Sequence, residues 1–174
     1  MRKLILDELG RPAIDDYRNM PKNPIVVVLD SIRSALNVGS VFRTSDAFAI
    51  EKIILCGISA TPPNREITKT AIGATESVSW SYQQDIKDAV SELRNLGYKI
   101  VGVEQTDSSV KLNEFTGFED RIALVFGNEV DGISESILND LDYCIEIPQY
   151  GTKHSLNVSV CAGIILWTLT HPGI

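Results

Sequence analysis

The sequence has few cysteines, few histidines and no apolar run of membrane-spanning length. Its 174 residues include three cysteines and two histidines. Cys56, Cys144 and Cys161 lie among apolar neighbours without metal-type spacing, so we expect reduced, buried thiols rather than disulfides or metal ligands. The apolar segment 158–169 is shorter than the roughly 18 residues that a membrane span needs, and acidic residues interrupt the N-terminus before any signal-peptide run. We therefore expect a cytoplasmic protein without a membrane segment or a metal.

Common motifs for nucleotide binding and nucleophilic catalysis are also missing. No G-x-G-x-x-G follows the first predicted strand, which excludes a Rossmann dinucleotide site. Neither the P-loop pattern G-x-x-x-x-G-K-[ST] nor the nucleophile elbow G-x-S-x-G occurs. His154 and His171 belong to no Asp-His-Ser pattern, and a loop histidine such as His154 is more often a surface residue than a base. The chemistry must therefore come from other polar side chains.

Positive charge is in the minority, which argues at first against a nucleic-acid partner. The chain carries 16 Lys and Arg against 23 Asp and Glu, a formal net charge of -7. Phosphate neutralisation by basic side chains supplies most non-specific affinity for nucleic acids. The balance is uneven, however, because residues 1–70 carry 10 basic and 8 acidic side chains, and all the excess negative charge follows them. The first 70 residues therefore leave room for a basic face and a nucleic-acid partner.

The apolar runs predict an α/β fold with a mostly parallel sheet and helices on both faces. Five strands are expected, at 25–29, 52–58, 99–104, 121–126 and 143–147. Between the second and third, Asp85 caps a helix with an apolar stripe that Gly97 ends, so these two strands form a βαβ unit. A final helix begins at Ser155 and is apolar almost all round through Leu169, which predicts burial, with a second subunit as one candidate for the covering surface. We expect one domain, 1–174, with residues 1–24 as an N-terminal arm.

Polar and glycine-rich loops follow three of the predicted strands. The first contains Asn37-x-Gly39-x-x-x-Arg43, in which the glycine lets a backbone or a ligand approach closely. The others lie at 127–132 and 147–159. Because a parallel α/β sheet binds its ligand at the carboxyl ends of its strands, these loops predict a cofactor cleft.

Taken together, the three motifs resemble those of the SpoU/TrmH branch of the SPOUT RNA methyltransferases. The resemblance covers about residues 25–168, and the segment 69–74 also resembles a family segment. The matching residues are Asn37, Gly39 and Arg43; Gly127, Asn128, Glu129 and Gly132; and Ile147, Pro148, Gly151, Ser155, Leu156, Asn157, Val158 and Ser159.

The resemblance implies a SPOUT-type α/β fold with a C-terminal trefoil knot, at about 122–168, that binds S-adenosyl-L-methionine. It also implies a homodimer with the active site at the interface, and methyl transfer to a ribose 2'-oxygen of RNA, with tRNA favoured over rRNA. The implied cofactor-binding residues are Val125, Gly127, Asn128, Ile147, Pro148, Ser155, Leu156 and Asn157. The implied catalytic residues are Arg43, Asn37, Glu129, Ser155 and Asn157.

Arg43 is the main catalytic candidate. An arginine side chain is normally too basic to remove a proton, but it can bind the neighbouring phosphate and hold the nucleotide. It then either stabilises the alkoxide or lets the phosphate take the proton, and both roles stay open. Arg33, Arg65 and Lys69 are the candidate RNA phosphate contacts. The alternatives are an RNA base methyltransferase, or a non-catalytic RNA-binding protein that retains the knot.

Overall fold

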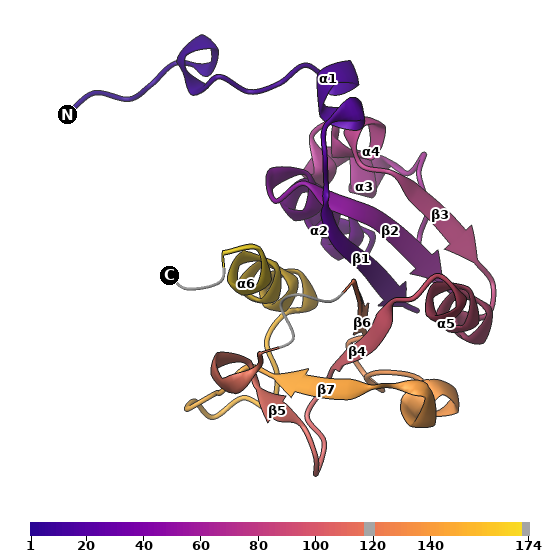
Figure 1. Ribbon diagram of the computed structural model, residues 1–174. Helices are drawn as coiled ribbons and strands as arrows, with labels where there is room; N and C mark the ends of the chain where they lie inside the picture. Colours follow the sequence, from indigo (N-terminus) through magenta and orange to yellow (C-terminus); the bar gives the residue numbers. More distant parts are fainter. Residues whose placement is uncertain (117–120, 172–174) are drawn as a thin grey trace.

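A seven-stranded parallel sheet lies at the centre of the part of the chain that the computed structural model describes, residues 1–116 and 121–171 (Figure 1). Its strands run in the order β3-β2-β1-β6-β4-β7-β5, and every neighbouring pair is parallel. Their bounds are β1 Asn23–Asp30, β2 Ile50–Cys56, β3 Trp80–Gln83, β4 Lys99–Val103, β5 Val110–Lys111, β6 Ile122–Phe126 and β7 Tyr143–Glu146. The predicted parallel α/β sheet is confirmed.

Helices cover both faces of this sheet. The helices are α1 Ile14–Asn19, α2 Ala35–Ala47, α3 Arg65–Ala71, α4 Ala74–Ser77, α5 Ile86–Asn95 and α6 Val158–Thr170, with 3-10 turns η1 Leu6–Leu9, η2 Leu112–Glu114 and η3 Glu135–Asp140. Side chains of α2, α3 and α6 pack in one buried cluster with Val27 and Leu29 of β1. Side chains of α5 and η3 pack in a second cluster with Val26 and Val28. Alternate residues of β1 thus point to opposite helix layers.

The caps of α5 and α6 show how local sequence sets helix bounds. Asp85 caps α5 by accepting a hydrogen bond from the Lys87 N–H, and Gly97 follows the helix with a φ of 83°, both as expected. The expected start of the last helix at Ser155 is wrong. Asn157 is the cap, because its side-chain oxygen accepts hydrogen bonds from the N–H groups of Ser159 and Val160, and α6 begins after it.

Two short strands were not predicted from the sequence, and the order of the strands differs from one predicted βαβ unit. β3 and β5 have four and two residues, and β3 carries no run of buried apolar side chains. The two strands expected to form one βαβ unit, β2 and β4, are parallel but are not neighbours, since β1 and β6 lie between them. β6 therefore inserts into the middle of the sheet although it comes late in the chain.

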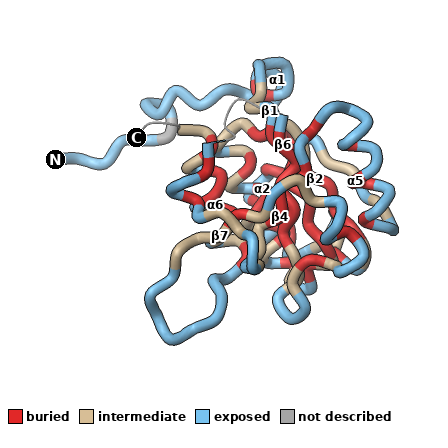
Figure 2. The backbone as a smooth tube through the Cα atoms, turned by 60° about the horizontal axis from the view of Figure 1, so that its bottom comes forward, coloured by how far each residue is buried: buried red, intermediate tan, exposed pale blue. Residues whose placement is uncertain are grey.

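The N-terminal residues extend away from the sheet, as Figures 1 and 2 show. α1 holds the base of this arm against the body, because Tyr17 is buried and its hydroxyl donates to the Asp46 carbonyl at 3.1 Å. Figure 2 shows the buried residues gathered in the sheet and its covering helices, while the arm is exposed. Across the described residues, no helix has the length and hydropathy that crossing a membrane requires.

Candidate functional site

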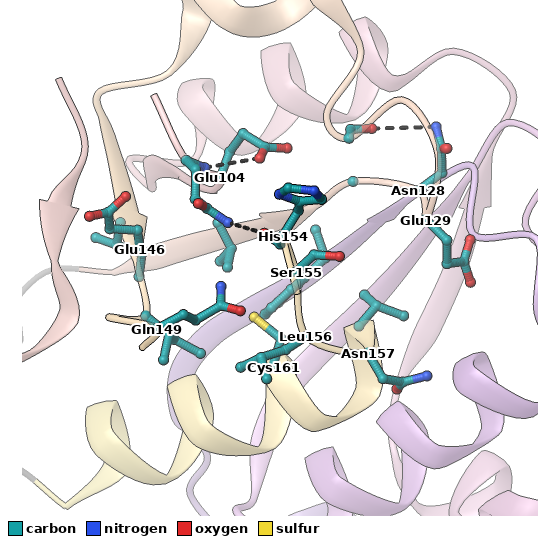
Figure 3. A pocket seen from close by; sticks show the side chains of 18 of the residues that line it. Glu104, Asn128, Glu129, Glu146, Gln149, His154, Ser155, Leu156, Asn157 and Cys161 are labelled. Atoms are coloured by element: carbon teal, nitrogen blue, oxygen red, sulfur yellow. Dashed lines mark hydrogen bonds between the residues drawn. The ribbon is translucent and has the colours of Figure 1, made fainter. Parts of the chain in front are cut away.

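A cavity of about 390 Å³ opens at the carboxyl ends of β4, β6 and β7, beside the start of α6 (Figure 3). This volume falls within the range of small-molecule sites. Its wall includes Gly127 and Asn128 after β6, Ile147 after β7, and the segment 154–158 that leads into α6. The second and third predicted motifs therefore meet at one cavity.

The loop after β6 is folded back on itself by Asn128. The Asn128 N–H donates to the Gly132 carbonyl at 3.0 Å, and the Gly132 N–H returns a hydrogen bond to the Asn128 carbonyl at 3.1 Å. The Asn128 side-chain oxygen also accepts from the N–H groups of Val130 and Asp131, both at 2.9 Å. A Cβ on Gly127 would lie 2.0 Å from the Gly132 carbonyl carbon, so this tight loop requires glycine.

Side chains from all three motifs join in one chain of hydrogen bonds. Asn157 Nδ2 donates to Asn37 Oδ1 at 3.2 Å, and Asn37 Nδ2 donates to Glu129 Oε1 at 3.0 Å. The Arg33 N–H donates to Glu129 Oε2 at 3.2 Å. The first motif, on α2, is thereby tied to the cavity loop and to the cap of α6.

The Glu129 carboxylate is held in its charged form. Burial disfavours ionisation, but hydrogen bonds from its own backbone, from the Asn37 side chain and from the backbones of Arg33 and Ser34 outweigh burial and lower the pKa of Glu129. An anionic Glu129 can therefore orient polar or cationic groups in the cavity.

Most predicted cofactor residues line the cavity, and two do not. Gly127, Asn128, Ile147, Ser155, Leu156 and Asn157 all line it. Val125 does not, because its side chain is fully buried in the cluster beneath α5, and its neighbour Phe126 faces the cavity instead. Pro148 is likewise absent from the wall, between the lining residues Ile147 and Gln149.

Arg43 lies outside the cavity of its own chain. It is exposed on α2, and within the described residues it has no ion pair or side-chain hydrogen bond. Gly39, on the same helix, serves a close approach of backbones rather than of a ligand. A Cβ there would lie 2.4 Å from the Ile67 carbonyl oxygen of α3, so α2 and α3 pack directly against each other.

The three candidate RNA contacts belong to two segments of the chain, α3 and the residues before α2. Arg65 and Lys69 are exposed and one turn apart on α3, whereas Arg33 lies beside the cavity loop, with a guanidinium nitrogen 3.7 Å from Asp131 Oδ2.

Several cavity residues were not identified from the sequence. Glu104, Gln105, Glu146, His154 and Cys161 all line the wall. Gln105 supports the third motif by donating from Nε2 to the His154 carbonyl at 2.8 Å. Its place as the last residue of the predicted strand 99–104 was the signal that could have identified Glu104, because the motif loops also stand at strand ends.

The wall carries three glutamates, while no lysine or arginine contributes to it among the described residues. Its apolar part includes Ile145, Ile147, Leu156 and Val158. Such a wall repels a polyphosphate, and it suits a ligand with an apolar face, hydroxyl donors and positive charge.

Comparisons with known proteins agree with this geometry. The chain is 31% identical over 152 residues to the 23S rRNA (guanosine-2'-O-)-methyltransferase RlmB of Neisseria meningitidis, covering 87% of this chain and 60% of that protein. It is 26% identical over 170 residues to a tRNA (guanosine(18)-2'-O)-methyltransferase of Borreliella burgdorferi, covering 97% of this chain and 76% of that one. The crystal structure of an AdoMet-bound rRNA methyltransferase from Sinorhizobium meliloti is similar with a TM-score of 0.79 and 25% identity, over 88% of this chain and 59% of that one.

The chain thus spans about 60% of the length of the Neisseria and Sinorhizobium proteins. Residues 24–167, most of the chain, match the sequence profile of the SpoU rRNA Methylase family. The sequence motifs, the parallel sheet and this match agree, and the chain belongs to the SpoU rRNA methylase family.

Proposed function

We propose that this protein transfers a methyl group from S-adenosylmethionine to a ribose 2'-oxygen of RNA. The observation that carries the proposal is the hydrogen-bonded chain Asn157–Asn37–Glu129, which joins the three motifs at the edge of one cavity. The names of the Neisseria and Borreliella relatives support it, because both describe guanosine 2'-O-methylation of RNA.

The cavity residues fit this cofactor. The glycine loop at 127–132 and the apolar side chains of Ile147 and Leu156 suit an adenosine, and the carboxylates suit its hydroxyl and cationic groups. S-Adenosylmethionine supplies an activated methyl group on a sulfonium. Ser155 and Asn157, at the start of α6, are the proposed contacts on the side nearest Asn37.

We also propose that two copies of the chain form a homodimer through α2 and α6. The two helices lie side by side in the same direction, since Asn37 contacts Asn157 at their starts and Phe48 contacts the Trp167 ring, with 5.9 Å between centroids, at their ends. α6 exposes an apolar stripe along this surface, with Val160 52%, Ile164 38% and Trp167 48% exposed. A second copy of the same stripe is an occupant of matching length and chemistry.

A dimer of this kind gives Arg43 a role. Arg43 and Leu36 are seven residues apart on one face of α2, and both are exposed. Pairing through this surface directs Arg43 towards the partner rather than towards its own cavity. Val160→Asp is expected to give a monomer by light scattering that retains its fold by circular dichroism and loses methyl transfer. A dimeric variant would refute this interface.

The proposed task of Arg43 is to hold the substrate phosphate and so place the ribose hydroxyl. A ribose hydroxyl is a weak acid, so transfer needs loss of its proton and an in-line approach of the oxygen to the methyl group. The guanidinium binds a phosphate through two parallel hydrogen bonds, which fixes the nucleotide. Either that phosphate takes the hydroxyl proton, or the hydroxyl loses its proton to water and Arg43 stabilises the resulting alkoxide.

Finer features of the proposal rest on family resemblance and topology. Transfer RNA is the proposed substrate over ribosomal RNA, and the cytoplasm, where both occur, is the proposed location. The C-terminal trefoil knot, at about 122–168 of a single domain, is supported by the insertion of β6 between β1 and β4.

The test is methyl transfer from labelled S-adenosylmethionine to unmodified total tRNA and rRNA, followed by digestion to nucleosides and mass analysis. A 2'-O-methylnucleoside that forms with the wild type and not with Arg43→Ala is expected. Arg43→Ala should still bind the cofactor, since Arg43 lies outside the cavity wall. A methylated base would instead identify a base methyltransferase, and cofactor binding without transfer to either RNA would contradict the proposed reaction.

A further inference from the structure

The three cavity glutamates differ in the groups that donate hydrogen bonds to their carboxylates. Glu129 is bound by Asn37 and by backbone N–H groups, and Glu146 Oε2 accepts a hydrogen bond from the Ser109 hydroxyl at 3.0 Å. Glu104 accepts only from backbone: from the Gln105 N–H at 2.9 Å and the Ile133 N–H at 3.3 Å. In the described part of the chain, none of the three forms an ion pair. The cavity therefore holds uncompensated negative charge.

Glu104 is placed to act on the interior of the cavity. It follows β4, and its side chain lies at the cavity wall, as Figure 3 shows. Its hydrogen bond from the Ile133 N–H places it beside the end of the loop 127–132. Its effect extends to α6, where burial first and then the charge of Glu104 raise the pKa of the Cys161 thiol to about 11. Since Cys161 also lines the wall, a ligand between β4 and α6 lies in the field of Glu104.

Substrate and product forms of the proposed cofactor differ by one charge. At neutral pH S-adenosylmethionine has a net charge of +1, because its sulfonium adds to a balanced ammonium and carboxylate. S-Adenosylhomocysteine keeps the ammonium and carboxylate but has a thioether, so it is neutral overall. Shape distinguishes the two by one methyl group only, which is a weak basis for discrimination.

We propose that Glu104 is a specificity-determining residue, which makes the cavity bind S-adenosylmethionine in preference to S-adenosylhomocysteine through its uncompensated negative charge. The inference rests on the proposed function, because it assigns a task to a residue of the same cofactor cavity. Its consequence is weaker product inhibition, since the neutral product gains less from the carboxylate than the cationic substrate does.

The size of the effect follows from Coulomb's law. The cavity is partly open, so its effective dielectric constant lies between that of water and that of a protein surface. At such a dielectric constant, a unit negative charge several ångströms from a cationic ligand strengthens the binding of that ligand about fivefold. Removal of the Glu104 charge should weaken S-adenosylmethionine binding by that factor and leave S-adenosylhomocysteine binding nearly unchanged. The ratio of the two dissociation constants should fall by the same factor.

The test is isothermal titration calorimetry of the full chain with three ligands at fixed low salt. The ligands are S-adenosylmethionine, S-adenosylhomocysteine and sinefungin, which has a protonated amine in place of the methylated sulfonium. Glu104→Gln removes the charge and keeps an acceptor, and Glu104→Asp keeps the charge. Glu92→Gln, on exposed α5 away from the cavity wall, is the matched control for loss of one negative charge.

We expect Glu104→Gln to weaken both cationic ligands about fivefold and to spare S-adenosylhomocysteine, while Glu104→Asp and Glu92→Gln keep the wild-type ratio. The unchanged product affinity then shows that the cavity is intact. Equal weakening of all three ligands, in Glu104→Gln and also in Glu104→Ala, would overturn the charge mechanism and leave the proposed function standing. Failure of the wild-type protein to bind any of the three would overturn the proposed function together with this inference.

Discussion

The contact between α2 and α3 at Gly39 provides a quantitative test of the fold that supports the site. In an open helix interior, alanine is more favourable than glycine by about 1 kcal/mol. At position 39, however, the added Cβ would lie 2.1 Å from Thr70 Oγ1 and 2.4 Å from the Ile67 carbonyl oxygen. Thr70 can rotate only by losing its hydrogen bond to the Leu36 carbonyl, and the Ile67 oxygen is backbone.

Relief of this overlap requires α3 to move away from α2. Over-packing of this kind costs about 1–3 kcal/mol, and the backbone contact indicates the upper end. After the gain in helix propensity, we expect Gly39→Ala to lower the free energy of unfolding by about 2 kcal/mol. With a urea dependence of about 2 kcal/mol per molar, the unfolding midpoint should fall by about 1 M.

The assay is urea unfolding followed by tryptophan fluorescence at one protein concentration. Gly151→Ala is the matched control, because a Cβ there has no neighbour within 4 Å, and it should be neutral or stabilising by up to about 1 kcal/mol. A Gly39→Ala protein as stable as the wild type would refute the packing argument. Loss of RNA methylation at unchanged stability would instead assign Gly39 to ligand approach.

Three further predictions concern the site and its surroundings. Because the pKa of the Cys161 thiol is about 11, its alkylation should be slow at pH 8 and should become about tenfold faster with each pH unit up to that value. S-Adenosylmethionine should slow this alkylation, since Cys161 lines the cavity. An equal rate of modification with and without S-adenosylmethionine, measured by peptide mass analysis, would contradict the position of Cys161 in the wall. Asn157→Ala should lower the free energy of unfolding by about 1 kcal/mol and should also weaken cofactor binding. Asn157→Asp should have wild-type stability but weakened cofactor binding, because aspartate keeps the oxygen that caps α6 and lacks the amide that donates to Asn37. Arg65→Glu should weaken RNA binding in a filter assay and flatten its salt dependence, and an unchanged slope would exclude Arg65 as a phosphate contact.

The sheet was predictable where strands are long and buried. β1 is a run of apolar residues buried on both faces, and such a run has few alternatives to a central parallel strand. β3 and β5 were missed because their few residues have mixed burial and no periodic pattern. Strand order was equally inaccessible, since no local pattern tells β6 to insert between β1 and β4.

The site residues that could be predicted from the sequence are those in the polar and glycine-rich loops that follow predicted strands. Asn37, Glu129 and Asn157 were selected from three separate loops, and the fold joins them by hydrogen bonds. Glu104 was missed because a single glutamate at the end of a strand is ordinary in sequence, and only the fold shows that it forms no ion pair with any described residue. Gly39 permitted two readings, and only the position of Ile67 distinguishes helix packing from ligand approach.

The distribution of charge around the site bears on the proposed task of Arg43. Three glutamates line the cavity, and a polyanion that approaches it meets repulsion that few basic groups offset, because the chain carries a net charge of -7. An RNA phosphate can therefore stay beside the cavity only where a cation holds it. Arg43 is exposed on α2 without an ion pair in the described residues, so its charge is free for a phosphate. Under the proposed function, the acidity that favours a cationic cofactor also makes a cation such as Arg43, supplied by the partner copy, necessary for holding the substrate phosphate.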